Sequence, residues 1–386
     1  MTATAAAVPA IGYSALVERI KRGDGMAHVP LEGSWELTYR CNLTCTHCWV
    51  NLPAGDRRAR QHELSAGEID RIAGEIVDAG GLWLLLTGGE IFIRPDFLDI
   101  YRRLKRRGLL LTLYTNGTMI TERAADLLAE YPPSLVEVSL YGITPGTYAA
   151  VTEVPALERC LRGIELLRER RIKIRLKSVV TTANYDEFLD IAAWVKREFG
   201  QRFRYDPNIN FRKIEGREGM APARVRVPAA RVVALDRALD AETDDLRETY
   251  QDMVDKTRQG VDTGRGQYVF ECGAGLNSYH IDPYGRLTSC MMVPSIGHDL
   301  REGSFREGWD SFLERVVYLK KTRTTRCDSC AISGNCTSCP GWSLLEHGDL
   351  EEPVDYICDV NHGRAEAFGA GELIRTIRMK GAQAHG

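Results

Sequence analysis

An alternation of strand-like and helix-like segments between residues 33 and 211 limits the fold of this chain more than any other sequence feature. Short apolar runs, several of them flanked by Gly or Asn, are typical of buried strands. Six such runs occur at residues 34–39, 82–86, 109–114, 135–140, 173–180 and 202–211. Amphipathic segments lie between them at residues 66–79, 95–107, 122–130, 156–170 and 185–199. This order predicts an α/β fold with a parallel sheet, open or closed into a barrel, and a site at the C-terminal strand ends.

The rest of the chain differs in composition and in predicted secondary structure. A Gly-, Pro- and Arg-rich stretch at residues 212–227 suggests a connector, and residues 229–258 form a polar, acidic helical stretch that we interpret as a surface helix bridging two units. From residue 267 onward, short strands, turns and cysteines predominate, and so loop-rich a segment needs crosslinks such as ligated metal. The predicted units are a lead segment at 1–30, a core at 31–211, a connector at 212–265, a cysteine-rich unit at 266–370 and a tail at 371–386.

Composition restricts the partners and the compartment. The chain has 386 residues, of which 44% are hydrophobic and 27% are charged, and its formal net charge is −3. Because there is no excess of Lys and Arg, we expect no nucleic-acid partner. The sequence shows neither a secretory signal nor a membrane-spanning stretch, so we expect a cytoplasmic protein without a membrane contact. In that reducing compartment, the 11 cysteines favour metal binding over disulfides.

Three of these cysteines follow the first predicted strand. Cys41, Cys45 and Cys48 have the spacing C-x3-C-x2-C, and the next cysteine along the chain is Cys160. Three thiolates on one loop can bind three corners of a [4Fe–4S] cluster, whereas ordinary clusters use four cysteines. The fourth iron would then be open to a ligand. A zinc site with His47 as fourth ligand is the alternative, although structural zinc usually takes paired C-x2-C knuckles.

The cysteine loop resembles that of the radical S-adenosylmethionine (SAM) superfamily. The resemblance implies a partial (β/α)6 TIM-like barrel, followed here by a small cysteine-rich domain stapled by metal clusters. It also implies that SAM chelates the open iron through its amino and carboxylate groups. Gly88, Gly89 and Glu90, at the end of the second predicted strand, resemble the family motif that contacts the SAM amino group. Glycines allow close backbone approach, and a carboxylate can balance an ammonium group. A tight turn is the alternative.

The same resemblance implies further SAM contacts at other strand ends. His47 would border the adenine, Asn116 would form part of the site wall, and Ser139 would contact the ribose or carboxylate region. Lys177 would pair with the SAM carboxylate. The alternatives are a turn-shaping role for Asn116 and a surface position for Lys177.

Seven further cysteines lie between residues 272 and 358. Their pattern resembles the SPASM domain, which carries two auxiliary clusters, although the spacing between Cys336 and Cys339 is x2 where x3 is common. The resemblance assigns the outer cluster to Cys327, Cys330, Cys336 and Cys358, and the inner cluster to Cys272, Cys290 and Cys339. The fourth inner position would be open, or filled by substrate, solvent or another residue type. Two zinc knuckles are the alternative. Cys160, on a predicted helix, is interpreted as a buried, inert thiol.

These assignments predict an enzyme with SAM and three [4Fe–4S] clusters. SAM cleavage would give a 5′-deoxyadenosyl radical that removes hydrogen from an unactivated carbon, and the auxiliary clusters would accept the remaining electron. The resemblance favours oxidative maturation, such as crosslinking, of a ribosomally made peptide. The alternatives are a small-molecule or porphyrin-modifying oxidase or decarboxylase, and a non-catalytic zinc-binding protein. The expected partners are an external low-potential electron donor and a separate leader-peptide-binding protein, since about 30 residues precede the core. No residue is assigned to substrate chemistry.

Overall fold

The computed structural model describes residues 28–50, 52–209, 222–241, 245–258 and 266–371. Nearly all of the predicted lead segment and tail, and part of the predicted connector, lie outside these residues. A nine-stranded sheet has the strand order β11-β10-β9-β1-β4-β5-β6-β7-β8. Neighbouring strands from β9 to β8 in this order run parallel. The six strands predicted from the sequence are β1 (Glu32–Thr38), β4 (Trp83–Gly88), β5 (Leu110–Thr115), β6 (Leu135–Ser139), β7 (Ile174–Val179) and β8 (Arg204–Asp206).

Strand β8 is shorter than the predicted run at residues 202–211. It ends at Asp206, directly before Pro207, which has no N–H to donate to the ladder. Residues 210 and 211 lie outside the described part of the chain. Residues 40–41 and 52–53 add a short parallel pair, β2 (Arg40–Cys41) with β3 (Leu52–Pro53).

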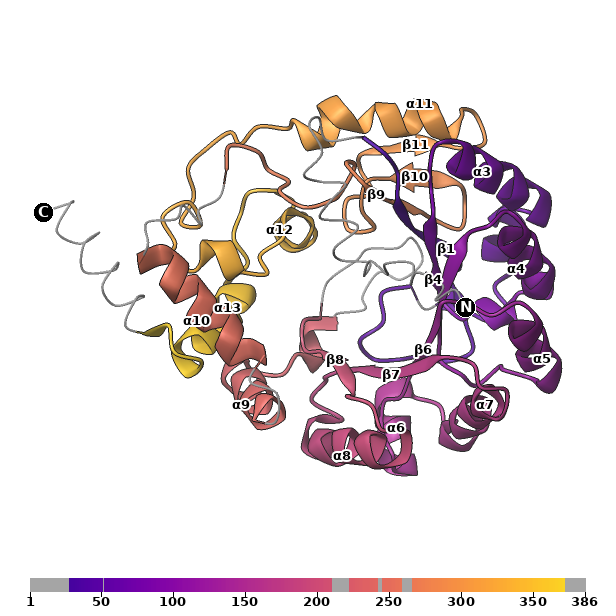
Figure 1. Ribbon diagram of the computed structural model, residues 1–386, viewed down its shortest axis with the longest axis horizontal. Coiled ribbons are helices and arrows are strands. Elements are labelled where there is room, and N and C mark those ends of the chain that lie inside the picture. The colour runs from indigo at the N-terminus through magenta and orange to yellow at the C-terminus, as the bar shows by residue number, and fades with distance from the viewer. Residues whose placement is uncertain (1–27, 51, 210–221, 242–244, 259–265, 372–386) are drawn as a thin grey trace, which may run out of the picture.

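Helices cover one face of the sheet as an outer arc in Figure 1. The five predicted helices are α3 (Ala66–Asp78), α4 (Phe97–Arg106), α5 (Glu122–Glu130), α7 (Leu157–Glu169) and α8 (Phe188–Phe199). Ser65 and Glu68 form a capping box at the start of α3. Elements outside the predicted segments are α2 (Arg57–His62), α6 (Pro145–Thr152) and η1 (Ile91–Ile93), whereas η2 (Tyr185–Glu187) forms the first turn of the segment predicted at 185–199.

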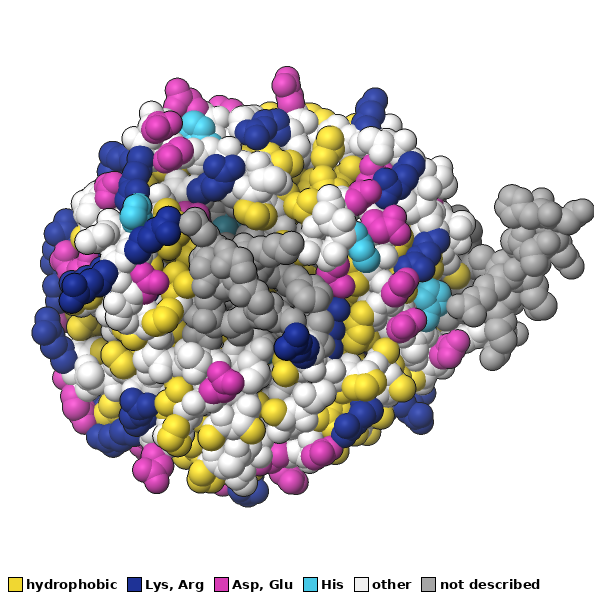
Figure 2. All heavy atoms as spheres, turned by 180° about the vertical axis from the view of Figure 1, so that it is seen from behind, with side chains coloured by type: hydrophobic (Ala, Val, Ile, Leu, Met, Phe, Trp, Pro, Cys, Tyr) yellow, Lys and Arg dark blue, Asp and Glu magenta, His cyan; other side chains and the backbone are white. Residues whose placement is uncertain are grey.

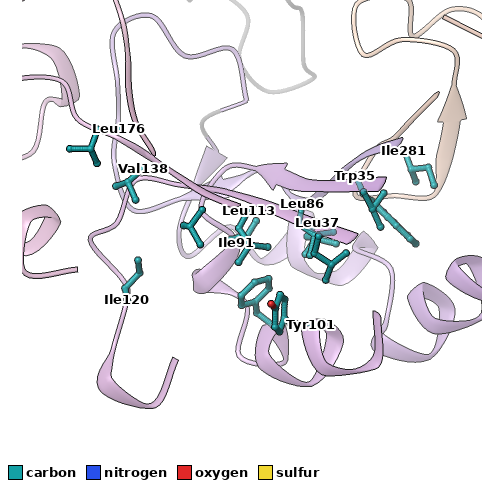
Figure 3. Close-up of a cluster of buried hydrophobic side chains, with 14 of the residues drawn as sticks. Trp35, Leu37, Leu86, Ile91, Tyr101, Leu113, Ile120, Val138, Leu176 and Ile281 are labelled. Atoms are coloured by element: carbon teal, nitrogen blue, oxygen red, sulfur yellow. The ribbon is translucent and has the colours of Figure 1, made fainter. Parts of the chain in front are cut away.

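The core lies between the strands and this helical arc. Leu86 and Leu113 point from neighbouring strands toward Tyr101 of α4, as Figure 3 shows, and all three are fully buried. Val138 and Leu176 continue the same buried row. Because side chains alternate along a strand, the residues between these positions point to the opposite, inner face of the curved sheet.

The cysteine-rich segment continues the same sheet. Strand β9 (Ser278–Ile281) pairs in parallel with β1, with Ser34 opposite His280. The antiparallel strands β10 (Arg286–Thr288) and β11 (Gly297–Asp299) extend it. The remaining elements of this segment are α11 (Phe305–Asp310), η4 (Leu313–Val317), η5 (Ser333–Asn335), α12 (Pro340–His347) and α13 (Asp355–Ala367). The predicted boundary between the connector and the cysteine-rich unit, at residue 266, therefore falls between two parts of the chain whose strands belong to the same sheet.

The acidic stretch predicted as one surface helix contains α9 (Ala229–Asp240) and α10 (Asp245–Arg258), preceded by η3 (Pro222–Val225). Helix α9 has exposed side chains, as expected of a surface helix, but its other face is buried. Asp236 is fully buried, and its carboxylate accepts hydrogen bonds from Arg364 Nε of α13 at 2.7 Å and from the Tyr205 hydroxyl at 2.6 Å. Acidic composition was misleading because a buried carboxylate is tolerated when it is paired in this way.

Acidic and basic side chains are interspersed around the rim of the face shown in Figure 2. Within the described residues, no helix combines the length and the apolar character that crossing a bilayer requires.

Candidate functional site

The predicted cofactor residues meet at one edge of the sheet. The loop with Cys41, Cys45 and Cys48 follows β1, and Glu90 follows β4. Asn116 follows β5 in the same way. Because β1, β4 and β5 are adjacent and parallel, their C-terminal ends lie side by side, which is where sites form in such sheets.

A buried ion pair fixes the start of the cysteine loop. Arg40, directly before Cys41, donates from Nε and Nη2 to the two carboxylate oxygens of Glu63, both at 2.9 Å. Both side chains are 5% exposed, and the Thr38 hydroxyl also donates to Glu63, at 2.5 Å. A bidentate Arg–carboxylate contact fixes the orientation of the two side chains as well as the distance between them. The sequence analysis missed this pair because Glu63 lies 23 positions away.

Gly88 and Gly89 bring the end of β4 against the backbone of the cysteine loop. Gly89 N–H donates to the carbonyl of Thr38 at 2.7 Å, and Glu90 N–H donates to that of Arg40 at 2.9 Å. A Cβ at position 89 would lie 2.1 Å from the Arg40 carbonyl oxygen. Gly88 also has a φ of 121°, a conformation that favours glycine. The glycines therefore permit a close approach between two chain segments, whereas the sequence analysis considered only an approach to a ligand.

Glu90 connects this turn to the end of β5. Its carboxylate is fully buried and accepts hydrogen bonds from the Thr115 hydroxyl at 2.9 Å and the Asn116 N–H at 2.8 Å. Burial raises the pKa of Glu90 to about 7, against the lowering effect of these bonds. The Asn116 amide donates to Asn42 at 3.0 Å and approaches Cys41 Sγ at 3.7 Å. Three strand ends are thus joined through polar side chains at the cysteine loop.

The thiols of the loop lie in a buried environment. Burial, together with the neighbouring Glu90 and Cys48, raises the pKa of Cys41 to about 12. Burial also places the pKa of Cys45 well above its ordinary value, with Cys48 and Cys41 adding to the effect. Without a cationic group the thiols would stay protonated, so a bound metal cluster suits this environment as the group that favours thiolates.

His47 is buried beside the same loop. Burial lowers its pKa to about 4, so the imidazole is neutral. Its ring lies 5.0 Å from that of Tyr141, measured between centroids. Nδ1 is buried and has no hydrogen-bond partner among the described residues. This nitrogen is available to a ligand.

Ser139 and Lys177 lie opposite each other on β6 and β7. Lys177 is not a surface lysine, since its side chain is 19% exposed and its Nζ lies 3.3 Å from the Glu137 carboxylate. Nζ also lies over the ring of Tyr114. Burial lowers the pKa of Lys177 to about 7, although Glu137 acts in the opposite direction. The predicted partner for Lys177 was the SAM carboxylate, and in the described structure a protein carboxylate holds this position.

A hydrogen-bonded group of polar side chains on the inner face was also not predicted from the sequence. His280 of β9 has Nδ1 at 2.9 Å from the Ser34 hydroxyl and Nε2 at 3.1 Å from the Glu36 carboxylate. Both His280 and Glu36 are 2% exposed. The register of β9 beside β1 brings them together, and the sequence carries no signal for pairing across 244 positions.

In the cysteine-rich segment, the four predicted outer ligands are close enough to interact. Burial raises the pKa of Cys358 to about 11 against the lowering effect of Arg326, and Cys327, Cys336 and Cys330 contribute to the rise. His362, one turn along α13 from Cys358, has Nε2 at 3.6 Å from Cys330 Sγ. The sequence analysis did not identify this histidine, although its i, i+4 spacing from Cys358 puts both on one helix face.

The predicted inner ligands are less uniform. Cys272 is exposed, whereas Cys290 and Cys339 are half-buried. A Cβ at Gly341 would lie 2.7 Å from Met292 Cβ and 3.5 Å from Cys339 Sγ, so Cys339 lies near the turn that follows Cys290. The assignment of these three cysteines to one cluster stays a prediction. Among the described residues, no three His, Cys, Asp or Glu side chains are arranged to hold a single metal ion.

Cys160 is fully buried on α7, as predicted. Burial raises its pKa to about 12, which suits an unreactive thiol. Its Sγ lies 3.8 Å from the Ser139 carbonyl.

A largely parallel, barrel-like sheet with a three-cysteine loop at its C-terminal edge defines a class of metal-cluster enzymes. Comparison with known proteins gives the family. Residues 35–195 match the family model described as "Radical SAM superfamily", and this part of the chain is accordingly a radical SAM domain, a domain whose cofactors are SAM and a [4Fe–4S] cluster. The alternative of a non-catalytic zinc-binding protein is therefore set aside.

Three similar proteins span most of the chain. An AdoMet-dependent heme synthase of Methanosarcina barkeri is 25% identical over 353 residues, which cover 86% of this chain and 97% of the relative. The antilisterial bacteriocin subtilosin biosynthesis protein AlbA of Bacillus subtilis is 25% identical over 322 residues, covering 81% of this chain and 67% of the relative. Streptococcus suis SuiB, solved bound to its precursor peptide SuiA, has a similar fold, with a TM-score of 0.64, 18% identity and coverage of 89% of this chain and 78% of that chain.

Proposed function

We propose that this enzyme oxidatively modifies a ribosomally made peptide by activating a C–H bond. The observation that carries the proposal is the meeting of the cysteine loop, Glu90 and Asn116 at the edge of a sheet whose inner face is polar. Such an edge can hold a reactive cofactor while the inner face holds the substrate.

The residues present fit the cofactors that the family implies. Cys41, Cys45 and Cys48 would bind three irons of a [4Fe–4S] cluster, whose cleavage of SAM supplies the 5′-deoxyadenosyl radical. The unpartnered Nδ1 of His47 suits contact with the polar edge of an adenine. Glu90, held by Thr115 and Asn116, would accept the SAM amino group together with Gly88 and Gly89.

Ser139 and Lys177 complete the proposed SAM site. Their opposite positions on β6 and β7 support a shared role near the SAM carboxylate and ribose. The task of the protein is to bind, to orient and to exclude water around the reactive carbon.

The cysteine-rich segment is proposed to be a SPASM domain with two auxiliary [4Fe–4S] clusters, three clusters in all. The outer one would use Cys327, Cys330, Cys336 and Cys358, which influence one another electrostatically. The inner one would use Cys272, Cys290 and Cys339, with a fourth position taken by another ligand. These clusters would accept the electron left on the substrate after hydrogen abstraction.

A peptide substrate is supported by the similarity to a bacteriocin biosynthesis protein. A fold like that of a structure containing a precursor peptide agrees with it. An external low-potential electron donor, a separate leader-peptide-binding protein and a cytoplasmic location complete the proposal.

The second candidate is modification of a porphyrin or another small molecule. The observation in its favour is the match to a heme synthase along 97% of that relative's length. The cofactor chemistry would be the same, and only the occupant of the inner face would differ.

Anaerobic reconstitution tests the cofactor assignment. The wild-type chain should hold about twelve irons and form 5′-deoxyadenosine from SAM under a chemical reductant. The triple variant with Cys41, Cys45 and Cys48 replaced by Ala should lose about four irons and all SAM cleavage. Cys160→Ala, a matched loss of a thiol outside the clusters, should keep both. Surviving SAM cleavage in the triple variant would refute the assigned loop.

A substrate screen separates the two candidates. The reconstituted enzyme is incubated with SAM, reductant and either the short peptides encoded beside its gene or propionate-bearing porphyrins. The proposal expects a mass change in a peptide that corresponds to loss of hydrogen. Turnover of a porphyrin alone would support the second candidate instead.

A further inference from the structure

Three cations gather around one buried carboxylate on the inner face of the barrel. Glu137 of β6 is 2% exposed. Its Oε1 accepts hydrogen bonds from Arg204 Nη1 at 2.8 Å and Arg175 Nη1 at 3.2 Å. Lys177 Nζ lies 3.3 Å from Oε2. Burial by itself raises the pKa of Glu137, but Lys177 and Arg204 outweigh it and hold that pKa below its ordinary value.

These side chains belong to the inner face. Tyr114, Glu137 and Arg175 are opposite one another on β5, β6 and β7, and Lys177 is opposite Arg204 on β8. Alternate residues of the same strands, such as Val138 and Leu176, face the helical arc (Figure 1; Figure 3). The cation group therefore faces the interior that the curved sheet encloses.

The positive charge exceeds what the protein itself neutralises. One cation would balance Glu137, and three are present. A further acid, Asp206 of β8, interacts with Lys177 and Arg204. Burial raises the pKa of Asp206, which weakens its contribution at neutral pH. Burial likewise lowers the pKa of Lys177 to about 7, so the positive charge left in excess comes from the two arginines, which are set against the single carboxylate of Glu137.

The two arginines are the accessible members of the group. The side chains of Arg175 and Arg204 are 46% and 55% exposed, whereas Lys177 is 19% exposed. Each arginine reaches Glu137 through Nη1, and a guanidinium has five N–H donors in a planar fork suited to carboxylates. Glu137 thus orients two cationic groups that keep N–H donors not used in these bonds.

Arg204 lies two strands away from Ser139, a residue of the proposed cofactor site. Ser139, Lys177 and Arg204 are opposite one another on three successive strands. With neighbouring strands about 4.8 Å apart, the Cα atoms of Ser139 and Arg204 are roughly 10 Å apart. A molecule held by the arginines would extend along the inner face toward the strand ends.

We propose that Arg175 and Arg204 bind a carboxylate group of the substrate inside the barrel. The inference rests on the proposed function, because it takes the inner face as the substrate site. It narrows the substrate class to molecules that present a carboxylate, either the end or an acidic side chain of a peptide or a propionate side chain of a small molecule. Glu137 acts as a positioning residue that holds the two guanidinium groups.

Binding of a simple carboxylate tests this without substrate or reductant. The reconstituted protein is melted anaerobically with glutarate, with neutral glutaramide, and with chloride at matched ionic strength. Glutarate at ten times its Kd should raise the unfolding midpoint by roughly 2 °C, and the other two should not. The rise should disappear in R175Q/R204Q and persist in R197Q, which removes an arginine that is 66% exposed and paired with Glu198.

Single variants R175Q and R204Q guard against misfolding of the double variant, and each should weaken glutarate binding. An equal rise with chloride, no rise with glutarate, or a rise that survives in all three variants would overturn the proposal. The proposed function is tested separately by SAM cleavage, so either idea can fail while the other stands.

Two further comparisons identify the source of the carboxylate. Fluorescent peptides with a free or an amidated C-terminus, and porphyrins with free or esterified propionates, are titrated by anisotropy. Preference for the charged member in the peptide arm assigns a peptide carboxylate, and the same preference in the porphyrin arm assigns a propionate. If the charged and the neutral forms bound equally well among both the peptides and the porphyrins, the proposal that Arg175 and Arg204 bind a carboxylate would be contradicted.

Discussion

At the scale of single residues, the cysteine loop is held by neighbours that never need to touch iron. Arg40 and Glu63 fix its beginning through a buried ion pair. Gly89 lets the β4 turn approach the Arg40 carbonyl, and Asn116 reaches Cys41 from β5. The position of the three thiols therefore depends on contacts that can be changed while every cysteine is kept.

The variant Gly89→Ala tests the close approach. Its Cβ would lie 2.1 Å from the Arg40 carbonyl oxygen, so the loop must shift or the protein must lose stability. We expect lower iron content and loss of SAM cleavage. Gly146→Ala is the matched control, because a Cβ there meets nothing within 4 Å, and it should leave iron and SAM cleavage unchanged. Full iron loading and cleavage in Gly89→Ala would contradict the steric argument.

The lowered pKa of Lys177 makes stability depend on pH. Its folded pKa is about 7, against an ordinary value of 10.5, so between these values the unfolded chain binds more protons. Stability from this group should therefore rise from pH 7 to 10.5, by at most about 1.4 kcal/mol per pH unit. Urea unfolding of wild type and Lys177→Met at pH 7.5 and 9.5 measures it. The advantage of wild type should grow with pH, and an equal difference at both pH values would contradict the assignment.

The sequence predicted the cofactor residues better than their surroundings. Cys41, Cys45 and Cys48 were recognisable because their spacing is local. Glu63, Glu137 and His280 were not, because their partners come from other strands and no short pattern encodes such pairing. Lys177 was placed on the correct strand, but its burial could not be inferred without the register of β6 and β7.

At the scale of elements, the pairing of α9 with α13 joins the connector to the cysteine-rich segment. Asp236 and Arg364 form a buried pair across the two helices, with side chains 0% and 11% exposed. Alternation of hydrophobic and polar residues predicted five helices of the outer arc with boundaries close to those observed. It did not predict that an acidic helix would turn a carboxylate inward, because the partner lies 128 positions away.

The variant Arg364→Met should leave Asp236 buried without its cation. Removing one member of a buried pair costs about 3 kcal/mol, so the urea midpoint should fall clearly. In Asp236→Leu with Arg364→Met, much of this loss should be recovered because neither charge remains buried alone. If the double variant lost as much stability as Arg364→Met and Asp236→Leu lose separately, added together, the two charges would not be coupled.

At the scale of the whole molecule, one sheet unites the barrel and the cysteine-rich segment. Strand β9 covers the free edge of β1, and β1 leads directly into the cysteine loop. The sequence indicated a barrel followed by a second unit, but strand order could not be derived, since it depends on which edges meet after folding. The seven later cysteines are therefore attached to the barrel by main-chain hydrogen bonds.

A chain ending at residue 258 tests this union. Without β9, the β1 edge loses its neighbouring strand and Glu36 loses its contact with His280, and an exposed sheet edge promotes aggregation. We expect little soluble protein and no SAM cleavage after reconstitution. Residues 266–371 supplied as a separate chain during refolding should restore part of the soluble yield. A soluble, SAM-cleaving fragment without them would show that β9 is dispensable.

The neighbour that completes the first barrel strand is made only after more than 270 residues have been translated. While the ribosome is still synthesising the middle of the protein, the cysteine loop is complete but strand β9, which pairs with β1 beside it, has not yet been made. Iron delivered at that time would reach the cysteine loop before β1 is paired with β9. We therefore expect the cluster to be inserted after β9 has been synthesised and has paired with β1.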